Sequence, residues 1–228
     1  MAEVFKSVIG RLTGALGNMV FRNRADTTFI TMRPKSFTSG NDQAAKDRRA
    51  RFGLTGMFAT AVNQDSNLKA FWDLSTPANM TAANGIFKAN YKHITPDDVT
   101  DLVKMTPGIS VRADDTSSSM TNVLVSATIA ALGTDQKIDL LVETKIQMVA
   151  IIYCKDPVVI DEAKNHFICI KSAKMDLSLT NPIAFTIPLM KDETQYYDAY
   201  TSQKCFYTFV TMDDAGVPYH YTNTLIIP

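Results

Sequence analysis

Three histidines and three cysteines are the side chains of this sequence most able to do metal or nucleophilic chemistry. They are His93, His166, His220, Cys154, Cys169 and Cys205. No histidine pairs with another histidine or a cysteine at the short spacing that holds zinc, so no metal site is predicted. The cysteines are odd in number and widely spaced. This predicts three free thiols that act as small apolar residues in a reducing compartment, with one disulfide as the alternative.

One pair of residues could form a cysteine nucleophile and its base. Cys205 and His220 lie on opposite arms of the last predicted hairpin, and cysteine chemistry needs a nearby base. A buried thiol and a surface histidine explain the same residues without catalysis, and we favour that interpretation. The sequence therefore predicts no catalytic residues and a protein that is not an enzyme. A cysteine-dependent hydrolase is the least favoured alternative.

Acidic and glycine-rich stretches give no cofactor site either. Asp114-Asp115 and residues 213–216 lack the alternating oxygen ligands and the late bidentate glutamate of a calcium loop. Gly10, Gly14 and Gly17 are spaced wrongly for a phosphate-binding loop or a dinucleotide fingerprint. We therefore predict neither a cofactor nor a metal ion.

The remaining functional candidates are basic residues near the N-terminus. They are Arg22, Arg24, Arg33, Lys35, Arg48, Arg49 and Arg51, which we predict to bind a partner. Residues 1–51, the N-terminal basic block, hold ten basic and four acidic residues, a net charge of +6, and the rest of the neutral chain is therefore −6. Because the acidic remainder offers a matching surface, we favour protein partners, including copies of this chain, over nucleic acid.

The composition is that of a globular chain without a membrane segment. Of 228 residues, 46% are hydrophobic and 20% are charged, which is enough apolar material for one large domain or two small ones. No stretch approaches the ~20 apolar residues of a membrane helix. Lys6 and Arg11 interrupt the apolar residues of the N-terminus, so no secretion signal is predicted. We expect a soluble protein with no membrane partner.

Three regions along the chain differ in composition. Residues 1–40 form an arm too rich in glycine for a stable helix, with a predicted β-hairpin from Met19 to Arg33 that turns at residues 25–27. Residues 41–106 are predicted to be helical, and residues 107–228 to be β. The predicted fold class is α+β, with an N-terminal glycine-rich arm and β-hairpin, a helical middle and a C-terminal antiparallel immunoglobulin-like β-sandwich.

Four helices are predicted in the middle region. They are expected over residues 41–62, 67–72 and 82–91, and from residue 95 to a point before Pro107. Asn41 or Asp42 can cap the first helix. Thr95-Pro96-Asp97-Asp98 predicts the start of the fourth, because a threonine cap, a proline in the first turn and two carboxylates all favour a helix N-terminus.

About seven short strands are predicted in the C-terminal region. The clearest cover residues 122–130, 145–154, 166–170, 175–179, 204–212 and 217–227, with a short helix between Thr134 and Val142. The apolar run at residues 148–154 is typical of a central strand that is covered on both faces. Gly216 is expected to supply the positive φ of the last hairpin. These strands favour a sandwich on architecture alone, since the Cys…Trp…Cys signature of true immunoglobulin domains is missing.

The N-terminal residues also resemble a known family. Gly14-x-x-Gly17-Asn18-x-Val20, Arg33-Pro34-Lys35, Gln43 and Arg49-x-Arg51-Phe52 are similar to the opening of an uncharacterised family of similarly sized proteins, common in Bacteroidota genomes and their phages. The family has a β-rich C-terminal half and no assigned catalytic residues. The chain departs from its pattern at Ser39-Gly40-Asn41-Asp42, where an asparagine-proline pair is expected.

This resemblance implies a function. Related small proteins are similar to virion components of crAss-like phages, such as the rings between portal and tail. We therefore expect a non-enzymatic structural virion protein, a homo-oligomeric ring or connector of a phage neck or tail, assembled in the bacterial host cytoplasm. Its partners would be itself and neighbouring virion proteins such as the portal or other tail rings. The alternative is an immunoglobulin-like binding module for carbohydrate or a host surface, favoured if Tyr196, Tyr197 and Tyr200 line a groove.

Overall fold

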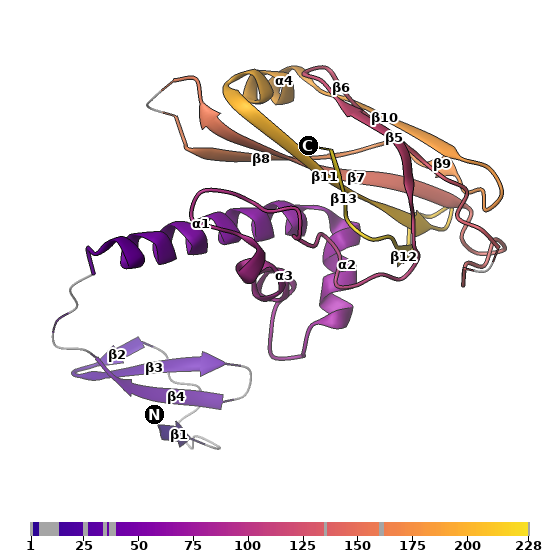
Figure 1. Cartoon of the computed structure of the whole chain (residues 1–228). Helices are drawn as coiled ribbons and strands as arrows, with labels where there is room; N and C mark the ends of the chain where they lie inside the picture. The colour runs from indigo at the N-terminus through magenta and orange to yellow at the C-terminus, as the bar shows by residue number, and fades with distance from the viewer. Residues whose placement is uncertain are drawn as a thin grey trace. The chain divides into compact units, whose positions relative to one another are not determined.

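A computed structural model describes residues 2–4, 14–24, 27–33, 36, 40–134, 136–159 and 162–227. The chain divides into two compact units (Figure 1). Unit 1 comprises Met1–Lys46 and Pro77–Asn79, and unit 2 comprises Asp47–Thr76 and Met80–Pro228. Both helices and antiparallel sheets are present, so the predicted α+β class is confirmed.

Unit 1 is built on a small four-stranded antiparallel sheet with the strand order β1-β4-β3-β2. Its strands are β1 Ala2–Val4, β2 Gly14–Leu16, β3 Met19–Arg24 and β4 Thr27–Met32. The pairing of β3 with β4 confirms the predicted hairpin, whose turn residues Ala25 and Asp26 lie outside the described residues. The sequence did not predict the β2–β3 hairpin. Its two-residue turn needs a φ of +56° at Gly17, which glycine adopts at little cost.

Three α-helices follow the small sheet along the chain. They are α1 Gln43–Gln64, α2 Ser66–Ser75 and α3 Ala82–Asn90, which confirms the first three predicted helices. The backbone N–H of Ala45 donates to Asp42 Oδ1 at 2.6 Å, so Asp42 caps α1 as predicted. The buried carboxylate of Asp65 caps α2 by accepting from the backbone N–H groups of Asn67 and Leu68.

The predicted fourth helix at Thr95 is wrong. A single 3-10 turn, η1 Tyr91–His93, precedes it, and residues 94–106 contain no helix. The Thr95 hydroxyl accepts from the Asp98 N–H at 2.9 Å, as an N-cap would. However, Ile94 pairs with Val99 in a β-bridge, and both side chains are fully buried. The motif therefore closes a tight turn, because burial of these two residues outweighs the weak stability of an isolated helical turn.

A six-stranded antiparallel sheet forms the centre of unit 2. Its order is β12-β11-β7-β8, and β13 and β9 pair with β11 and β7 respectively. The strands are β7 Lys145–Pro157, β8 Asn165–Lys171, β9 Met175–Asp176, β11 Tyr200–Met212, β12 Pro218–Tyr221 and β13 Leu225–Ile227. Residues 146–154 of β7 are buried without a break, which confirms the predicted central strand. Gly216 has a φ of +90° in the last hairpin, also as predicted.

A three-stranded antiparallel sheet, β10-β6-β5, shares a core with one face of the large sheet. Its strands are β5 Asp115–Met120, β6 Leu124–Ile129 and β10 Ile183–Pro188, of which only β6 was predicted. Val123 lies within the strand predicted at residues 122–130, but it precedes β6 and is exposed. The predicted helix between Thr134 and Val142 is wrong for the described residues 136–142, because the Asp139 carbonyl accepts from Val142 and Glu143 in a single turn.

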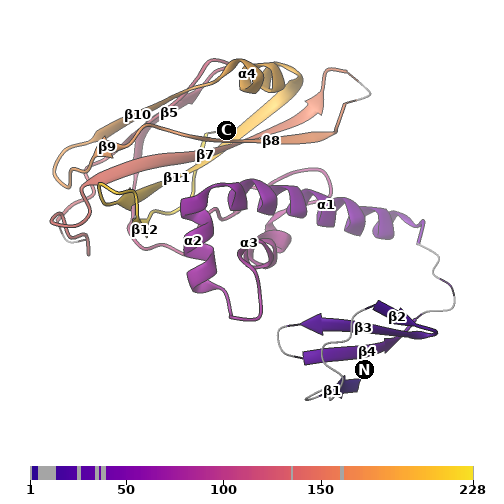
Figure 2. The same cartoon turned by 180° about the vertical axis from the view of Figure 1, so that it is seen from behind.

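The helices cover the opposite face of the six-stranded sheet (Figures 1 and 2). Phe58 of α1 lies edge-on to Phe167 of β8 and to Phe206 of β11, with ring centroids 6.0 Å apart in each pair. The indole N–H of Trp72 donates to the Met105 carbonyl at 2.8 Å. Unit 2 therefore has three layers, with one hydrophobic core on each side of the large sheet.

The compact units do not follow the three predicted regions. Residues of α1, α2 and α3 share a core with β7, β8 and β11, so the boundary predicted near residue 106 runs through packed structure. The boundary that the structure shows lies between Lys46 and Asp47, close to the start of α1. Most of α1 therefore belongs to the same unit as the C-terminal sheets.

We expect Phe58→Ala to lower the free energy of unfolding by about 3–5 kcal/mol, because it empties a fully buried position between the helices and the large sheet. Phe52→Ala is the matched control on the same helix. Phe52 is 62% exposed, and its ring contact with Phe87 is worth about 0.5–1.5 kcal/mol. Urea unfolding followed by circular dichroism measures both. Equal losses in the two variants would show that α1 does not hold these layers together.

Candidate functional site

The predicted partner-binding residues are divided between the two units. Arg22 and Arg24 both lie on β3. Arg33 follows β4, and its backbone N–H donates to the Asn18 carbonyl at 2.6 Å. The side chains of Arg22 and Arg33 are exposed. Lys35 lies outside the described residues.

Arg48, Arg49 and Arg51 all lie on α1, but their surroundings differ. Arg48 and Arg49 are exposed, whereas Arg51 is half-buried, with its guanidinium carbon 5.6 Å from the centroid of the Tyr91 ring. A cation over an aromatic ring at this distance is held in place by the ring's electrons. Arg51 is therefore part of the packing of unit 2, while Arg48 is exposed and has no ion pair among the described residues.

The face of the small sheet opposite Arg22 is apolar. Strand register places Leu16 beside Met19, and Met19 beside Met32, and these side chains are 66%, 40% and 72% exposed. Phe21 and Ile30 pair with each other on the same face. We call these five residues the apolar face. Among the described residues of unit 1 only Thr28 and Ala45 are buried, so that part of the unit has no hydrophobic core.

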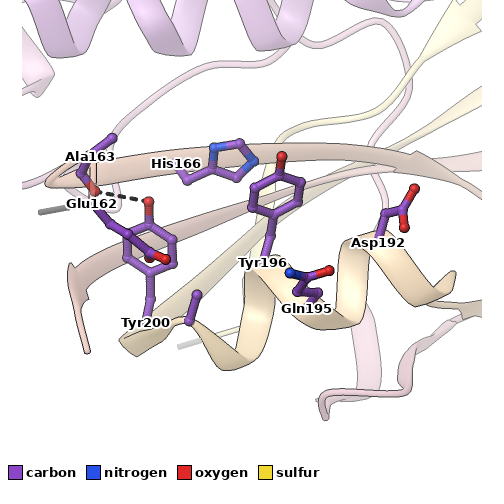
Figure 3. Close-up of a pocket in the computed structure, with 8 residues that line it drawn as sticks. Glu162, Ala163, His166, Asp192, Gln195, Tyr196 and Tyr200 are labelled. Atoms are coloured by element: carbon purple, nitrogen blue, oxygen red, sulfur yellow. Dashed lines mark hydrogen bonds between the residues drawn. The ribbon is translucent and has the colours of Figure 1, made fainter. Parts of the chain in front are cut away.

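A pocket of about 490 Å³ opens in unit 2 where β8, α4 Lys191–Asp198 and the start of β11 meet (Figure 3). We call it the aromatic pocket. It is lined by Glu162, Ala163, His166, Asp192, Gln195, Tyr196, Ala199 and Tyr200. The backbone N–H of Met190 donates to Glu193 Oε2 at 2.7 Å, which caps the start of α4. The Thr194 hydroxyl donates to the Asn122 carbonyl at 3.0 Å and ties α4 to the turn before β6.

Three rings form a row along the aromatic pocket. The His166 ring stacks on Tyr196, with centroids 4.2 Å apart, and on Tyr200 at 6.3 Å. Tyr200 is buried, and its hydroxyl donates to the Ala163 carbonyl at 2.9 Å, whereas Tyr196 is 50% exposed. Tyr197 packs instead against the core between the two sheets. Two of the three tyrosines named as groove candidates therefore line a pocket.

The aromatic pocket carries negative charge. Glu162 and Asp192 are exposed carboxylates, and no lysine or arginine is among the described residues that line it. Burial lowers the pKa of His166 below its ordinary value, so the ring is neutral at pH 7. Figure 3 shows Glu162 beside Tyr200 and Asp192 beyond Tyr196. The two carboxylates therefore stand at opposite ends of the row of rings.

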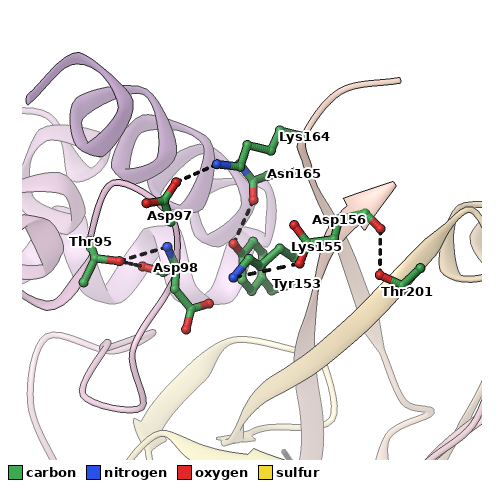
Figure 4. Close-up of polar contacts among 9 residues, drawn as sticks. All are labelled: Thr95, Asp97, Asp98, Tyr153, Lys155, Asp156, Lys164, Asn165 and Thr201. Carbon is green, nitrogen blue, oxygen red and sulfur yellow. Dashed lines mark hydrogen bonds and ion pairs between the residues drawn. The ribbon is translucent and has the colours of Figure 1, made fainter. Parts of the chain in front are cut away.

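Polar contacts anchor the hairpin between β7 and β8, which carries Glu162 (Figure 4). The Tyr153 hydroxyl donates to Asn165 Oδ1 at 2.8 Å, and the Lys164 ammonium pairs with Asp97 at 2.6 Å. Burial raises the pKa of Tyr153 above its usual value, so its hydroxyl remains a donor at alkaline pH. These contacts fix the hairpin to the loop after α3 and thereby position one wall of the pocket.

Cys205 and His220 lie far apart in the sheet. Cys205 lies opposite Ile227, whereas His220 lies opposite Thr211, six residues farther along β11, which is about 20 Å at about 3.3 Å per residue. Cys205 is fully buried, which confirms the buried thiol that we favoured, and burial raises the pKa of its thiol. His220 is half-buried rather than on the surface, and its Nδ1 lies 2.9 Å from Glu143 Oε2.

The three cysteines do not pair with one another. Cys154, Cys169 and Cys205 are free, and burial raises the pKa of the Cys154 and Cys169 thiols to about 12, so both stay protonated. No group of three or more histidine, cysteine, aspartate or glutamate side chains in the described part of the chain is arranged to hold a metal ion.

Sequence reasoning did not place six residues in the aromatic pocket, among them the polar side chains of Glu162, His166, Asp192 and Gln195. They come from two segments that β7 and β11 bring together, so strand register was needed to place them. The available signal was the acidic pair Asp192-Glu193 before two tyrosines, which indicates a helix start.

Comparisons of the chain with models of protein families, with curated proteins and with solved structures find no match. Among the described residues, none of the helices has the length and apolar composition needed to cross a membrane. What the protein does must therefore follow from its own residues and surfaces.

We expect Tyr200→Phe to loosen the wall of the aromatic pocket, because it removes the hydrogen bond to the Ala163 carbonyl. Backbone amide exchange in residues 162–166 should become faster, and the free energy of unfolding should fall by about 0.5–1.5 kcal/mol. Hydrogen-exchange mass spectrometry and urea unfolding measure the two effects. Tyr219→Phe, at an exposed tyrosine of β12, is the control and should change neither. Unchanged exchange in Tyr200→Phe would mean that this bond does not hold the wall.

Proposed function

We propose that the chain is a non-enzymatic structural protein that assembles with copies of itself through unit 1. The observation that carries the proposal is the apolar face, where Leu16, Met19 and Met32 are exposed while unit 2 buries two cores. Adjacent large apolar side chains on a surface are typical of an interaction site. A sheet of short strands is marginally stable until its face is packed, and a neighbouring subunit would supply that packing.

The energy available from such a contact is sufficient for assembly. Burying one large apolar side chain is worth about 1.5–3 kcal/mol, and ordering a long side chain offsets about 0.5–1.5 kcal/mol. The apolar face carries three exposed side chains of this kind, Leu16, Met19 and Met32, beside the half-buried Phe21 and Ile30. If unit 1 of one copy docks on a different surface of the next copy, the contact is head-to-tail, and it closes into a ring when its rotation permits.

The assembly would belong to a phage particle, as a ring or connector component of the neck or tail. The support is the resemblance of the N-terminal residues to a family common in Bacteroidota phages. Neighbouring virion proteins such as the portal or other tail rings would be its further partners, and the host cytoplasm its place of assembly. Nucleic acid is the less favoured partner, because the basic residues are divided between two units and Arg51 packs on Tyr91.

The two-sheet part of unit 2 would be a sandwich of the immunoglobulin-like kind. Two antiparallel sheets that share one core support this assignment, as do the alternately buried residues of β6 and β10. The helices on the other face of the larger sheet distinguish it from a free-standing sandwich.

A binding module for carbohydrate or a host surface is the second candidate function. The aromatic pocket favours it, because the exposed ring of Tyr196 beside Gln195 and Asp192 offers a stacking surface with hydrogen-bonding groups. It ranks second because the two carboxylates have no cation among the described lining residues, which favours a positively charged ligand over a neutral sugar.

We expect the triple variant Leu16→Ser, Met19→Ser, Met32→Ser to weaken self-association by about 100-fold or more, since each replaced side chain loses its apolar burial in the contact. Light scattering coupled to size-exclusion chromatography over a concentration series measures the assembly. Circular dichroism and urea unfolding should show unit 2 unchanged, because the three residues lie in unit 1.

A control set removes three other exposed apolar side chains. Leu74→Ser, Leu141→Ser and Val158→Ser lie in unit 2 and should leave assembly unaltered. Self-association that survives the triple variant, or that the control set also destroys, would refute a specific role for the apolar face. A wild-type chain that stays monomeric at every concentration would refute the proposed function itself.

A further inference from the structure

The aromatic pocket has the composition of a receptor for a planar cation. An exposed ring, Tyr196, stands between two carboxylates, Glu162 and Asp192, that form no ion pair with other described residues. The neutral ring of His166 packs behind Tyr196 and fixes its plane. A cation that entered would meet a ring face and a carboxylate together, both of which attract positive charge.

We propose that the aromatic pocket receives arginine side chains from the N-terminal basic block of a second copy of this chain. The inference rests on the proposed self-assembly and adds the acceptor site on unit 2. The guanidinium group is planar and stacks on aromatic rings, and it donates two parallel hydrogen bonds to a carboxylate. A lysine ammonium makes neither the stacked nor the bidentate contact, so arginine fits this pocket better.

The chain itself carries suitable donors. Arg22 and Arg33 of unit 1 and Arg48 of α1 are exposed and form no ion pair with another described residue. They lie within the block of net charge +6, while the aromatic pocket lies within the remainder of net charge −6. Opposite charges on separate surfaces of one chain complement each other between copies, and they steer the copies into a head-to-tail contact.

The first experiment measures the pocket alone, with Nα-acetyl-arginine amide as the probe in an NMR titration of the full chain. We expect saturable binding whose shifted signals map to β8, α4 and the start of β11. Nα-acetyl-citrulline amide, which has nearly the same shape without the charge, should bind at least tenfold more weakly. A parallel titration with a neutral trisaccharide tests the carbohydrate alternative.

Conservative variants identify the groups that bind. The pair Glu162→Gln and Asp192→Asn keeps the shape of the pocket and removes its charge, so arginine-probe affinity should fall at least tenfold. The control pair Asp73→Asn and Asp114→Asn removes the same charge from exposed carboxylates outside the pocket and should leave the affinity unaltered. Failure of the arginine probe to bind, or tighter binding of the trisaccharide, would overturn the assignment.

The second experiment tests whether another copy supplies the arginine. One variant lacks the acceptor (Glu162→Gln, Asp192→Asn), and a second lacks the donors (Arg22→Gln, Arg33→Gln, Arg48→Gln). Each alone should associate at least tenfold more weakly than the wild type. Because the first keeps its donors and the second keeps its pocket, the mixture should form one-to-one pairs that grow no further.

The outcomes separate this inference from the proposed function. Wild-type assembly that both variants reproduce would overturn the pocket as acceptor and leave self-assembly standing. A monomeric wild type that still binds the arginine probe would refute self-assembly and overturn the second copy as donor. Pairing in the mixture, together with loss of assembly in each variant alone, supports both.

Discussion

The antiparallel pairing of β7 with β11 is the interaction on which the rest of unit 2 depends. The two strands stay in register from the Tyr200–Pro157 pair to the Met212–Lys145 pair. Because side chains alternate along a strand, this one ladder supplies both cores. Ile152 and Tyr207 face the three-stranded sheet, while the adjacent residues on each strand face the helices. A slip of one residue would exchange the two faces, so both cores fix the same register.

The carboxylates near the two ends of this strand pair differ in burial and in hydrogen bonding. At the Lys145 end, Glu143 is buried and accepts from the Thr211 hydroxyl, from His220 Nδ1 and from a backbone N–H, so its hydrogen bonds are satisfied within the fold. At the Tyr200 end, Glu162 and Asp192 are exposed beside stacked rings and have no ion pair among the described residues. A satisfied buried carboxylate is a structural anchor, whereas open carboxylates beside aromatic rings are groups that a ligand can use.

The sequence predicted elements whose signals are local. The apolar run of β7 needs no partner to be recognised, and the carboxylate of Asp42 caps α1 within three residues. Thr95 gave a wrong prediction because its hydroxyl accepts from the backbone N–H three residues later, a bond that occurs in tight turns as well as at helix N-termini. Here the buried Ile94–Val99 bridge favours the turn. The aromatic pocket could not be predicted from the sequence, since its residues come together only when β8 and β11 have both paired with β7.

In the proposed assembly, apolar and charged surfaces would make different contributions to recognition. Hydrophobic contact is non-directional, so the apolar face can contribute affinity without fixing the orientation of the partner. Charged groups can select an orientation, because a basic side chain that is not placed beside a carboxylate loses that attraction and can be repelled by other basic groups. Arg22 lies on the face of the small sheet opposite Leu16, Met19 and Met32. Register places Val20 and Phe29 on the same face as Arg22, so the two faces differ in composition. Such a sheet can contact two different surfaces, and that asymmetry favours a directional contact over a symmetric pair.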